Sequence, residues 1–365
     1  MKIRKELLVE VVFLDLPLFL LGINYVLYNA LSMESMKIVF RMVAMILFLI
    51  GWILKGNFKV DLKAFIAIIL ALISLILNGS MALNFTVLVL FAICVEYPIE
   101  TIIKSAFRIN VSLVLLMIIL MASHAVDNTS YISTMGRFRR TLGFENPNVA
   151  ALFYSSAIYL FLVSRRELKK RSVFVAFLLT SVIYFYTNSR TSLVALLIFV
   201  GLELLDLIFE KKSMDKAKLV FGKCAVIFID VLFTLNLISV FMINKFMVLD
   251  QLLSYRISTF SRMINSAGLR CFLLGGTIKT VDNFYYMLLF QYGIIIYVFV
   301  AYSTHVAMKK MIANLNIKYV ALLVGLFLVA MMESSLIRPE ILVSLVVWKL
   351  VLSEKTDYLM ENVGN

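Results

Sequence analysis

Apolar stretches recur along this chain at short intervals, and they constrain its fold more than any other feature. A soluble fold of 365 residues needs more polar surface than this chain has, since 62% of its residues are hydrophobic, only 16% are charged and its mean hydropathy is +0.97. In lipid, the backbone must satisfy its own hydrogen bonds, which favours helices, and the alternating pattern of a membrane barrel is absent. The composition therefore predicts a helical membrane protein.

The apolar stretches predict an all-α protein with about twelve transmembrane helices in one domain, residues 1–365. They lie near residues 11–28, 38–54, 64–77, 81–95, 109–122, 148–163, 173–187, 191–209, 219–243, 283–302, 319–332 and 340–352. Several are shorter than the roughly 20 residues that cross a bilayer, so the helices must extend into flanking residues. The last stretch is the weakest, because it contains Glu340 and Lys349. No small-residue cleavage site follows the basic N-terminus, which predicts an uncleaved first helix.

The distribution of basic residues predicts that both termini are cytoplasmic. Under this topology the inside segments are 1–10, 55–63, 96–108, 164–172, 210–218, 303–318 and the C-terminal tail, and they hold 21 of the 35 basic residues. The outside segments hold 11, and the other three lie within or near spans. This excess follows the enrichment of Lys and Arg in cytoplasmic loops. The net charge of +13 is thus a sign of topology and not of nucleic-acid binding.

The outside segments are rich in arginine and poor in lysine. They hold three lysines and eight arginines, namely Arg137, Arg139, Arg140, Arg190, Arg256, Arg262, Arg270 and Arg338. Arginine binds phosphate or carboxylate through two parallel hydrogen bonds, whereas lysine is a hydrated point charge. The arginines therefore indicate an anionic ligand on the outer face. The alternative is that they bind lipid headgroups or pair with the nearby acids Asp127, Glu145, Asp250 and Asp282.

Two external loops, 123–147 and 244–282, are long enough to carry function. The second contains LDQLLSYRISTFSRMINSAG, residues 249–268, whose apolar side chains recur at helical spacing. This pattern predicts an amphipathic helix on the membrane surface. Arg256 borders its apolar stripe, and Arg262 faces the polar side.

Few familiar catalytic groups are present, and no Walker, dinucleotide or zinc motif occurs, so we expect no cofactor and no metal. His124 near the outer face is either a general base or an interfacial residue, and His305 is cytoplasmic under this topology. Asp230 lies in the middle of a span. An intramembrane acid is a functional candidate, and its alternative is a hydrogen bond between helices.

Three motifs resemble the O-antigen ligase and polymerase superfamily. The first is RRTLGFENPNVAALF, residues 139–153, which matches the family's signature at Arg140, Gly143, Asn146, Pro147, Asn148 and Ala150. The second is TNSRTSLVALL, with Ser189 and Arg190 at the start of a span. The third is a late block with Arg256, Phe260, Gly275, Gly276, Asp282, Asn283 and Tyr286. Many members have histidine where this chain has Asp282, and this departure argues against the ligase branch.

The resemblance implies a Wzy-type polymerase of capsular or O-antigen polysaccharide, with a GT-C-like fold in the bacterial plasma membrane. Its donor and acceptor would be oligosaccharides linked to undecaprenyl pyrophosphate, and other capsule-assembly proteins, such as a flippase and a chain-length regulator, would be its partners. Two alternatives remain. One is a ligase that transfers glycan to another acceptor, and the other is a flippase of lipid-linked oligosaccharides.

The resemblance and the charges together suggest roles for individual residues. Arg140, Arg190 and Arg256 would bind the pyrophosphate, whose developing charge fixed arginines can stabilise without a metal. Asp282 would accept the proton of the acceptor hydroxyl, with Glu145 or Glu333 as substitutes. The expected substrate-binding residues are Arg137, Arg139, Asn146, Asn148, Asn283, Tyr286, Arg338 and Glu333. For Asn148 and Asp282, helix capping is the alternative.

Overall fold

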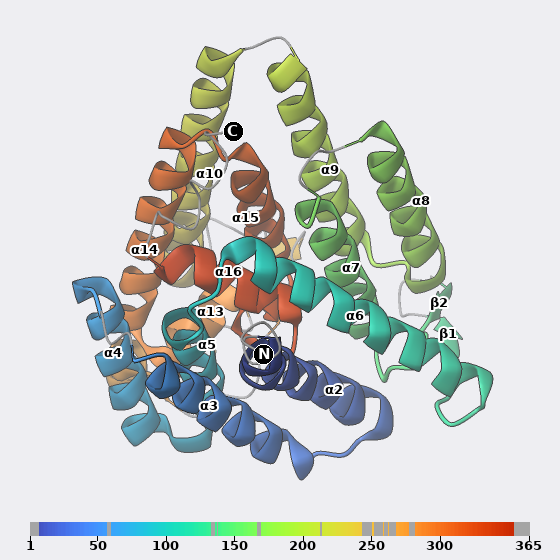
Figure 1. Ribbon diagram of the computed structural model, residues 1–365, viewed down its shortest axis with the longest axis horizontal. Coiled ribbons are helices and arrows are strands. Elements are labelled where there is room, and N and C mark those ends of the chain that lie inside the picture. The colour runs from blue at the N-terminus through green and yellow to red at the C-terminus, as the bar shows by residue number, and fades with distance from the viewer. Residues whose placement is uncertain are drawn as a thin grey trace.

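The chain folds into a bundle of helices with one small β-hairpin at its edge (Figure 1). The computed structural model describes residues 7–56, 60–132, 136, 138–165, 169–211, 214–242, 250–251, 258, 262, 268–276 and 282–353. Arg137, Arg256 and most of the helix expected over 249–268 lie outside these residues. The longer helices are α2 (Leu16–Leu31), α3 (Met36–Lys55), α4 (Leu62–Asn78), α5 (Leu83–Cys94), α6 (Ile99–Ala122), α7 (Pro147–Val163), α8 (Lys170–Thr187), α9 (Arg190–Lys211), α10 (Asp215–Phe241), α14 (Ile294–Ala313), α15 (Ile317–Val329) and α16 (Leu342–Leu352). The shorter elements are α13 (Phe284–Met287), π-helical turns at Val11–Asp15 and Leu288–Tyr292, 3-10 turns at Gly79–Ala82 and Ser335–Ile337, and strands β1 (Ser130–Ile132) and β2 (Phe138–Arg140).

The helices are those of a polytopic membrane protein, as the composition predicts. Among the described residues, six helical segments are long and apolar enough to cross a membrane: Leu7–Leu31, Met36–Lys55, Leu62–Cys94, Ile99–Ala122, Arg190–Phe209 and Asp215–Phe241. The spans expected at 64–77 and 81–95 fall in one of these segments, which turns at Gly79–Ala82 so that α5 packs against α4 and α3. Three apolar helices, α7, α15 and α16, are shorter than about 20 residues and pack against neighbouring helices.

The weakest expected span forms the centre of the bundle. Every residue of α16 is buried, and the helix packs against α5, α6 and α14. Lys349 donates from Nζ to the carbonyls of Ala92 (2.8 Å) and Val95 (2.7 Å), at the end of α5. Lys63 donates to the Val351 carbonyl (2.6 Å), at the end of α16. Two buried ammonium groups thus satisfy helix-terminal carbonyls that would otherwise lack donors.

Several boundaries differ from the expected ones. The segment 96–108, expected as an inside loop, is mostly helical, because α6 begins at Ile99 and buries its first turns. Glu100 in its first turn accepts a hydrogen bond from Tyr319 (3.1 Å). The span expected over 283–302 is interrupted at Gly293, where α14 begins after a π-helical turn.

Gly293 and Gly275 explain this interruption. Both have positive φ angles, +88° and +82°. A Cβ atom on Gly275 would lie 2.3 Å from the Gln291 carbonyl oxygen, and one on Gly293 would lie 2.4 Å from the Leu273 carbonyl oxygen. Two backbones therefore meet at a distance that only glycine permits, and the chain cannot continue as a regular helix there.

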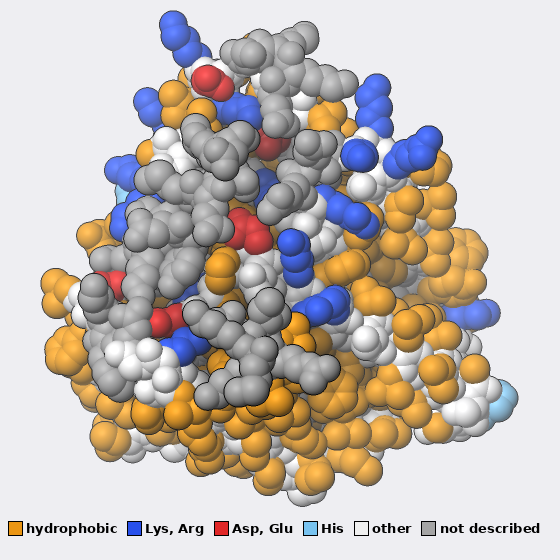
Figure 2. All heavy atoms as spheres, viewed as in Figure 1, with side chains coloured by type: hydrophobic (Ala, Val, Ile, Leu, Met, Phe, Trp, Pro, Cys, Tyr) orange, Lys and Arg blue, Asp and Glu red, His pale blue; other side chains and the backbone are white. Residues whose placement is uncertain are grey.

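The surface matches a lipid environment. Hydrophobic side chains cover the lower and right-hand margins of the view in Figure 2, whereas Lys and Arg gather above and towards the centre. On the outer flank of α8, large apolar side chains such as Phe174 and Phe185 are exposed. Exposed apolar surface of this extent is typical of a membrane-facing protein.

Contacts between helix ends divide the bundle into two sides. On one side, the Glu145 N–H donates to the Asn29 carbonyl (3.0 Å), which joins the loop before α7 to the end of α2. On the other side, Lys55 Nζ donates to the Glu96 carbonyl (2.9 Å), which joins the end of α3 to the loop before α6. We call the first side the hairpin side, because β1 and β2 precede Glu145 there.

Candidate functional site

The β-hairpin lies beside the ends of α6 and α8 (Figure 1). Its strands are antiparallel, with Ser130 opposite Arg140 and Tyr131 opposite Arg139. The Thr141 N–H donates to the Thr129 carbonyl (3.0 Å) and extends the pairing by one residue. The hairpin thus gives the two adjacent arginines a fixed backbone, and because successive residues of a strand point to opposite faces, their side chains have different surroundings.

Arg139 joins the hairpin to two helices. Its Nε donates to the Thr187 carbonyl at the end of α8 (2.9 Å), and its Nη2 donates to Asn148 Oδ1 in the first turn of α7 (2.5 Å). These hydrogen bonds use the side chain within the protein. Arg139, expected to bind substrate, thus joins the hairpin to α7 and α8 through two of its N–H groups and is partly exposed.

The Asn-Pro-Asn turn begins α7. Asn146 is the N-cap residue, and its side chain accepts a hydrogen bond from the Asn148 N–H (2.8 Å), while Pro147 occupies the first turn. Capping thus falls to Asn146, whereas the Asn148 side chain holds Arg139. Gly143, with a φ of +85°, lies against α6, and a Cβ atom there would lie 2.8 Å from Met117 Cε. The motif therefore folds the chain tightly between α6 and α7.

Arg140 lies on the other face of the strand. Its guanidinium carbon is 5.6 Å from the Phe138 ring centre and 5.5 Å from the Tyr186 ring centre. Among the described residues, no carboxylate lies within 4 Å of it. A cavity of about 720 Å³ opens beside it, lined also by Ser181, Asn188 and aromatic side chains of α8. Arg140 is a partly exposed cation over aromatic rings.

A second cavity adjoins the first and is almost wholly apolar. It has a volume of about 540 Å³ and lies between α6 and α8, with side chains of α7 between them. Tyr186 lines both cavities. On α6 the lining extends from Phe107 to Met121, about 21 Å at 1.5 Å per residue. We call this cavity the apolar groove. It runs along the helices and ends near Arg140.

Arg190 is the first residue of α9 and is exposed. It lies three residues after Thr187, whose carbonyl holds Arg139. The preceding Ser189 is buried, and its Oγ lies 3.2 Å from Ser192 Oγ. The structure thus brings the backbones of Arg139, Arg140 and Arg190 to one neighbourhood on the hairpin side.

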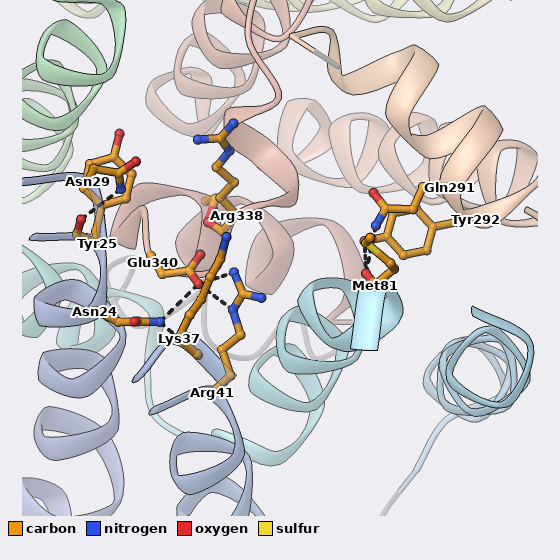
Figure 3. A network of polar contacts seen from close by, with 11 residues as sticks. Asn24, Tyr25, Asn29, Lys37, Arg41, Met81, Gln291, Tyr292, Arg338 and Glu340 are labelled. Carbon is orange, nitrogen blue, oxygen red and sulfur yellow. Dashed lines mark hydrogen bonds and ion pairs between the residues drawn. The ribbon is translucent and has the colours of Figure 1, made fainter. Parts of the chain in front are cut away.

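A second group of charges lies where α3 meets the segment before α16 (Figure 3). Arg41 donates to Glu340 Oε1 from both Nε and Nη2, each at 2.5 Å, and both side chains are buried. Asn24 donates to the same oxygen (3.3 Å). Arg338 extends away from this pair and donates to Ser334 Oγ (3.1 Å). The sequence analysis did not predict that Arg41 and Glu340 are partners. Arg41 was placed within or near a span, and Glu340 was treated only as a charge that makes 340–352 a weak span.

Asn283, expected to contact substrate, is fully buried. Its Oδ1 accepts a hydrogen bond from the Tyr286 N–H (3.1 Å), which makes it the N-cap of α13. Its Nδ2 donates to Asn236 Oδ1 (3.2 Å) and to the Met331 carbonyl (2.9 Å). Asn283 therefore fastens α13 to α10 and to the end of α15, and it offers no surface to a sugar.

Tyr286 is buried as well, with its hydroxyl 2.7 Å from Ser239 Oγ. The neighbouring Asp282 is exposed, and Glu333 is partly exposed. Of these expected site residues, the two acids can reach solvent and the tyrosine packs in the core.

Asp230 pairs with His305, since Asp230 Oδ2 lies 2.9 Å from His305 Nδ1. The contact joins α10 to α14, which agrees with the alternative of a hydrogen bond between helices. His305 was expected in the inside segment 303–318, but it lies within α14, which continues to Ala313. Among the residues that the structure describes, no cluster of three or more His, Cys, Asp or Glu side chains could hold a metal ion.

Comparisons with protein-family models, with curated proteins and with solved structures found no match. The fold and the site together define a helical membrane protein that has partly exposed arginines on one side, one of them at the end of an apolar groove.

Proposed function

We propose that this protein is a Wzy-type polymerase that joins oligosaccharide repeat units linked to undecaprenyl pyrophosphate, in capsule or O-antigen synthesis. In this proposal it is a GT-C-like protein of about twelve spans in the bacterial plasma membrane. Its termini are cytoplasmic, and the hairpin side is external. The observation that carries the proposal is the position of Arg140 at the end of the apolar groove.

A polyprenyl pyrophosphate has a long apolar tail and a compact anionic head, and this shape fits the groove and Arg140. The groove has the volume of a ligand site, is apolar along its length and lies between membrane-embedded helices. At its end, Arg140 offers a charged planar fork without a carboxylate partner in the described part of the chain. The apolar tail would therefore lie in the groove while the pyrophosphate binds Arg140, and Arg190 is a second cation nearby.

The reaction would proceed at the anomeric carbon of the donor. The acceptor hydroxyl oxygen forms a bond to this carbon, and the bond from the carbon to the pyrophosphate oxygen breaks. The electron pair leaves with the polyprenyl pyrophosphate, whose growing negative charge Arg140 and Arg190 stabilise. The hydroxyl proton passes to a carboxylate, for which the exposed Asp282 is the first candidate and Glu145 or Glu333 the substitute.

The test is an in vitro assay with purified full-length protein and lipid-linked repeat units, with glycan chain length measured on a gel. Wild-type protein should yield products of several repeat units. Arg140→Lys keeps the charge but loses the planar fork, so it should lose most of the polymerisation. The matched control is Arg270→Lys, which changes an exposed arginine on the predicted outer face and should stay near wild-type activity. Full activity of Arg140→Lys would remove the support for this site.

A deletion strain separates polymerase from flippase. Loss of a polymerase leaves single repeat units on the cell surface, whereas loss of a flippase keeps them inside the cell. Single surface units in the deletion strain are expected here, and their absence from the surface would contradict the proposal.

A further inference from the structure

A polymerase of this kind holds two lipid pyrophosphates at once, one on the donor and one on the acceptor, but the hairpin arginines form only one group. We infer that Lys37 and Arg338 form a second pyrophosphate-binding site, with the Arg41–Glu340 pair beneath it. The nature of the lipid in this inference rests on the proposed function. That the ligand is an anion is inferred from the two cations, Lys37 and Arg338, and does not depend on the proposed function.

Lys37 and Arg338 are two partly exposed cations that lie together beside the Arg41–Glu340 pair (Figure 3). Asn24 Nδ2 joins the backbone of Lys37 to this pair, because it donates to the Lys37 carbonyl (3.2 Å) and to Glu340 Oε1 (3.3 Å). Among the described residues, neither has a carboxylate within 4 Å. Lys37 Nζ lies 3.8 Å from the Tyr28 ring centre, and Arg338 binds only a hydroxyl among its resolved partners. Two like charges held together in this way repel each other, and an anion between them would relieve the repulsion.

The buried carboxylate at this point, Glu340, is already paired. Glu340 Oε1 accepts hydrogen bonds from Arg41 and Asn24, and the Arg41 and Glu340 side chains are only 7% and 5% exposed. Two further acids act on the site. Glu34 is exposed on the turn before α3, three residues before Lys37, and Glu333 is partly exposed, five residues before Arg338. The acids limit the affinity, which suits a substrate that must leave after each cycle.

The backbone at Arg338 is held in place before any ligand binds. The Arg338 carbonyl accepts hydrogen bonds from Ser344 Oγ (2.7 Å) and from the Ile341 N–H (3.1 Å). Trp348 Nε1 of the central helix α16 donates to the Leu336 carbonyl (2.6 Å). A cation on so rigid a segment loses little conformational entropy on binding, which favours a ligand site over a mobile surface charge.

The second site lies next to the first. Tyr25 of α2 donates from its hydroxyl to the Val149 carbonyl (3.1 Å), one residue after Asn148, which holds Arg139. The preceding residue, Asn24, donates to Glu340 Oε1 (3.3 Å) in the second group. Asn24 and Tyr25 thus connect the second group of cations to the start of α7, where Arg139 is held. Such neighbouring sites are what a transfer between two lipid-linked substrates requires.

The test is a binding titration of the full-length protein in phosphatidylcholine nanodiscs, with farnesyl pyrophosphate as the probe and calorimetry as the readout. Wild-type protein should bind two molecules per chain. The double variant Lys37→Gln/Arg338→Gln should lose one of them, with an affinity at that site at least about tenfold weaker. Arg140→Gln should lose the other, and the exposed Arg270→Gln should keep both.

The outcomes are distinct. If wild-type protein binds one probe that depends on Arg140 alone, or if the double variant still binds two, the second site is wrong and the proposed function is untouched. If two binding events persist but polymerisation is absent, the proposed function is wrong and the site stands. A repeat in nanodiscs with phosphatidylglycerol separates the ligands, because loss of the second event there would assign the site to lipid headgroups. Thermal unfolding of each variant confirms that it is folded.

Discussion

The buried pair of Arg41 and Glu340 permits a quantitative test of the fold. The two side chains come from α3 and from the segment before α16, and they join at 2.5 Å with almost no exposure to solvent. The perturbation is a set of three variants: Glu340→Ala, Arg41→Ala, and the combination Arg41→Met/Glu340→Leu. Only the combination removes both charges and refills the space with apolar atoms.

The expected magnitudes follow from desolvation. Glu340→Ala leaves the Arg41 guanidinium buried without an anion, which should lower the free energy of unfolding by about 3–5 kcal/mol. Arg41→Ala should cost somewhat less, because Asn24 still donates to Glu340 Oε1 (3.3 Å). The apolar combination should be close to neutral, or even stabilising, since a buried ion pair contributes little net stability against a hydrophobic replacement. The combination should therefore cost much less stability than either single change.

The assay is unfolding of the purified protein in mixed micelles by titration with a denaturing detergent, followed by tryptophan fluorescence. The order of stabilities should be wild type near the apolar combination, then Arg41→Ala, then Glu340→Ala. If both single variants lose less than about 1 kcal/mol, the pair is solvated and our reading of it as a buried link between α3 and α16 is refuted. Unfolding is chosen over activity because this pair also lies beneath the second proposed binding site.

Two further predictions follow from the backbone and from the topology. Gly275→Ala forces a Cβ atom to within 2.3 Å of the Gln291 carbonyl at a φ of +82° and should cost at least about 1–3 kcal/mol of unfolding free energy in the same titration. Gly201→Ala, with nothing within 4 Å, should cost nothing or stabilise its helix, and equal effects of the two changes would contradict the close approach. Ser130→Cys, in a Cys224→Ser background, should react with an impermeant thiol reagent on intact cells, and labelling only after lysis would reverse the orientation.

The hydropathy of the sequence predicts the membrane helices well, because lipid imposes the same demand on each of them. Hydropathy does not predict where a short helix lies in the bundle or which partners its charged residues have. α16 has Glu340 just before it and Lys349 within it, and these charges make it the poorest span by composition. In the structure they contact carbonyls and cations of distant segments. These partners offset the free-energy cost of burying the charges, and a hydropathy average does not include them.

For the candidate site, too, the sequence predicts local structure but not the contacts between distant segments. The local pattern of Asn146 and Pro147 indicates a helix start, because the capping geometry depends only on neighbouring residues. The pattern does not tell Arg139 from Arg140. Their different roles arise because the hairpin turns one towards Asn148 and the other towards Tyr186.

The sequence by itself determined the class of this protein, its helical architecture and the excess of arginine on one predicted face, since each depends on composition or on local spacing. Only the tertiary structure decided which charges share a neighbourhood. Lys37 and Arg338 come from opposite ends of the chain, and the apolar groove lies between α6 and α8, which are not consecutive. Such arrangements depend on how helices pack against one another, and packing is a property of the whole bundle that no local pattern encodes.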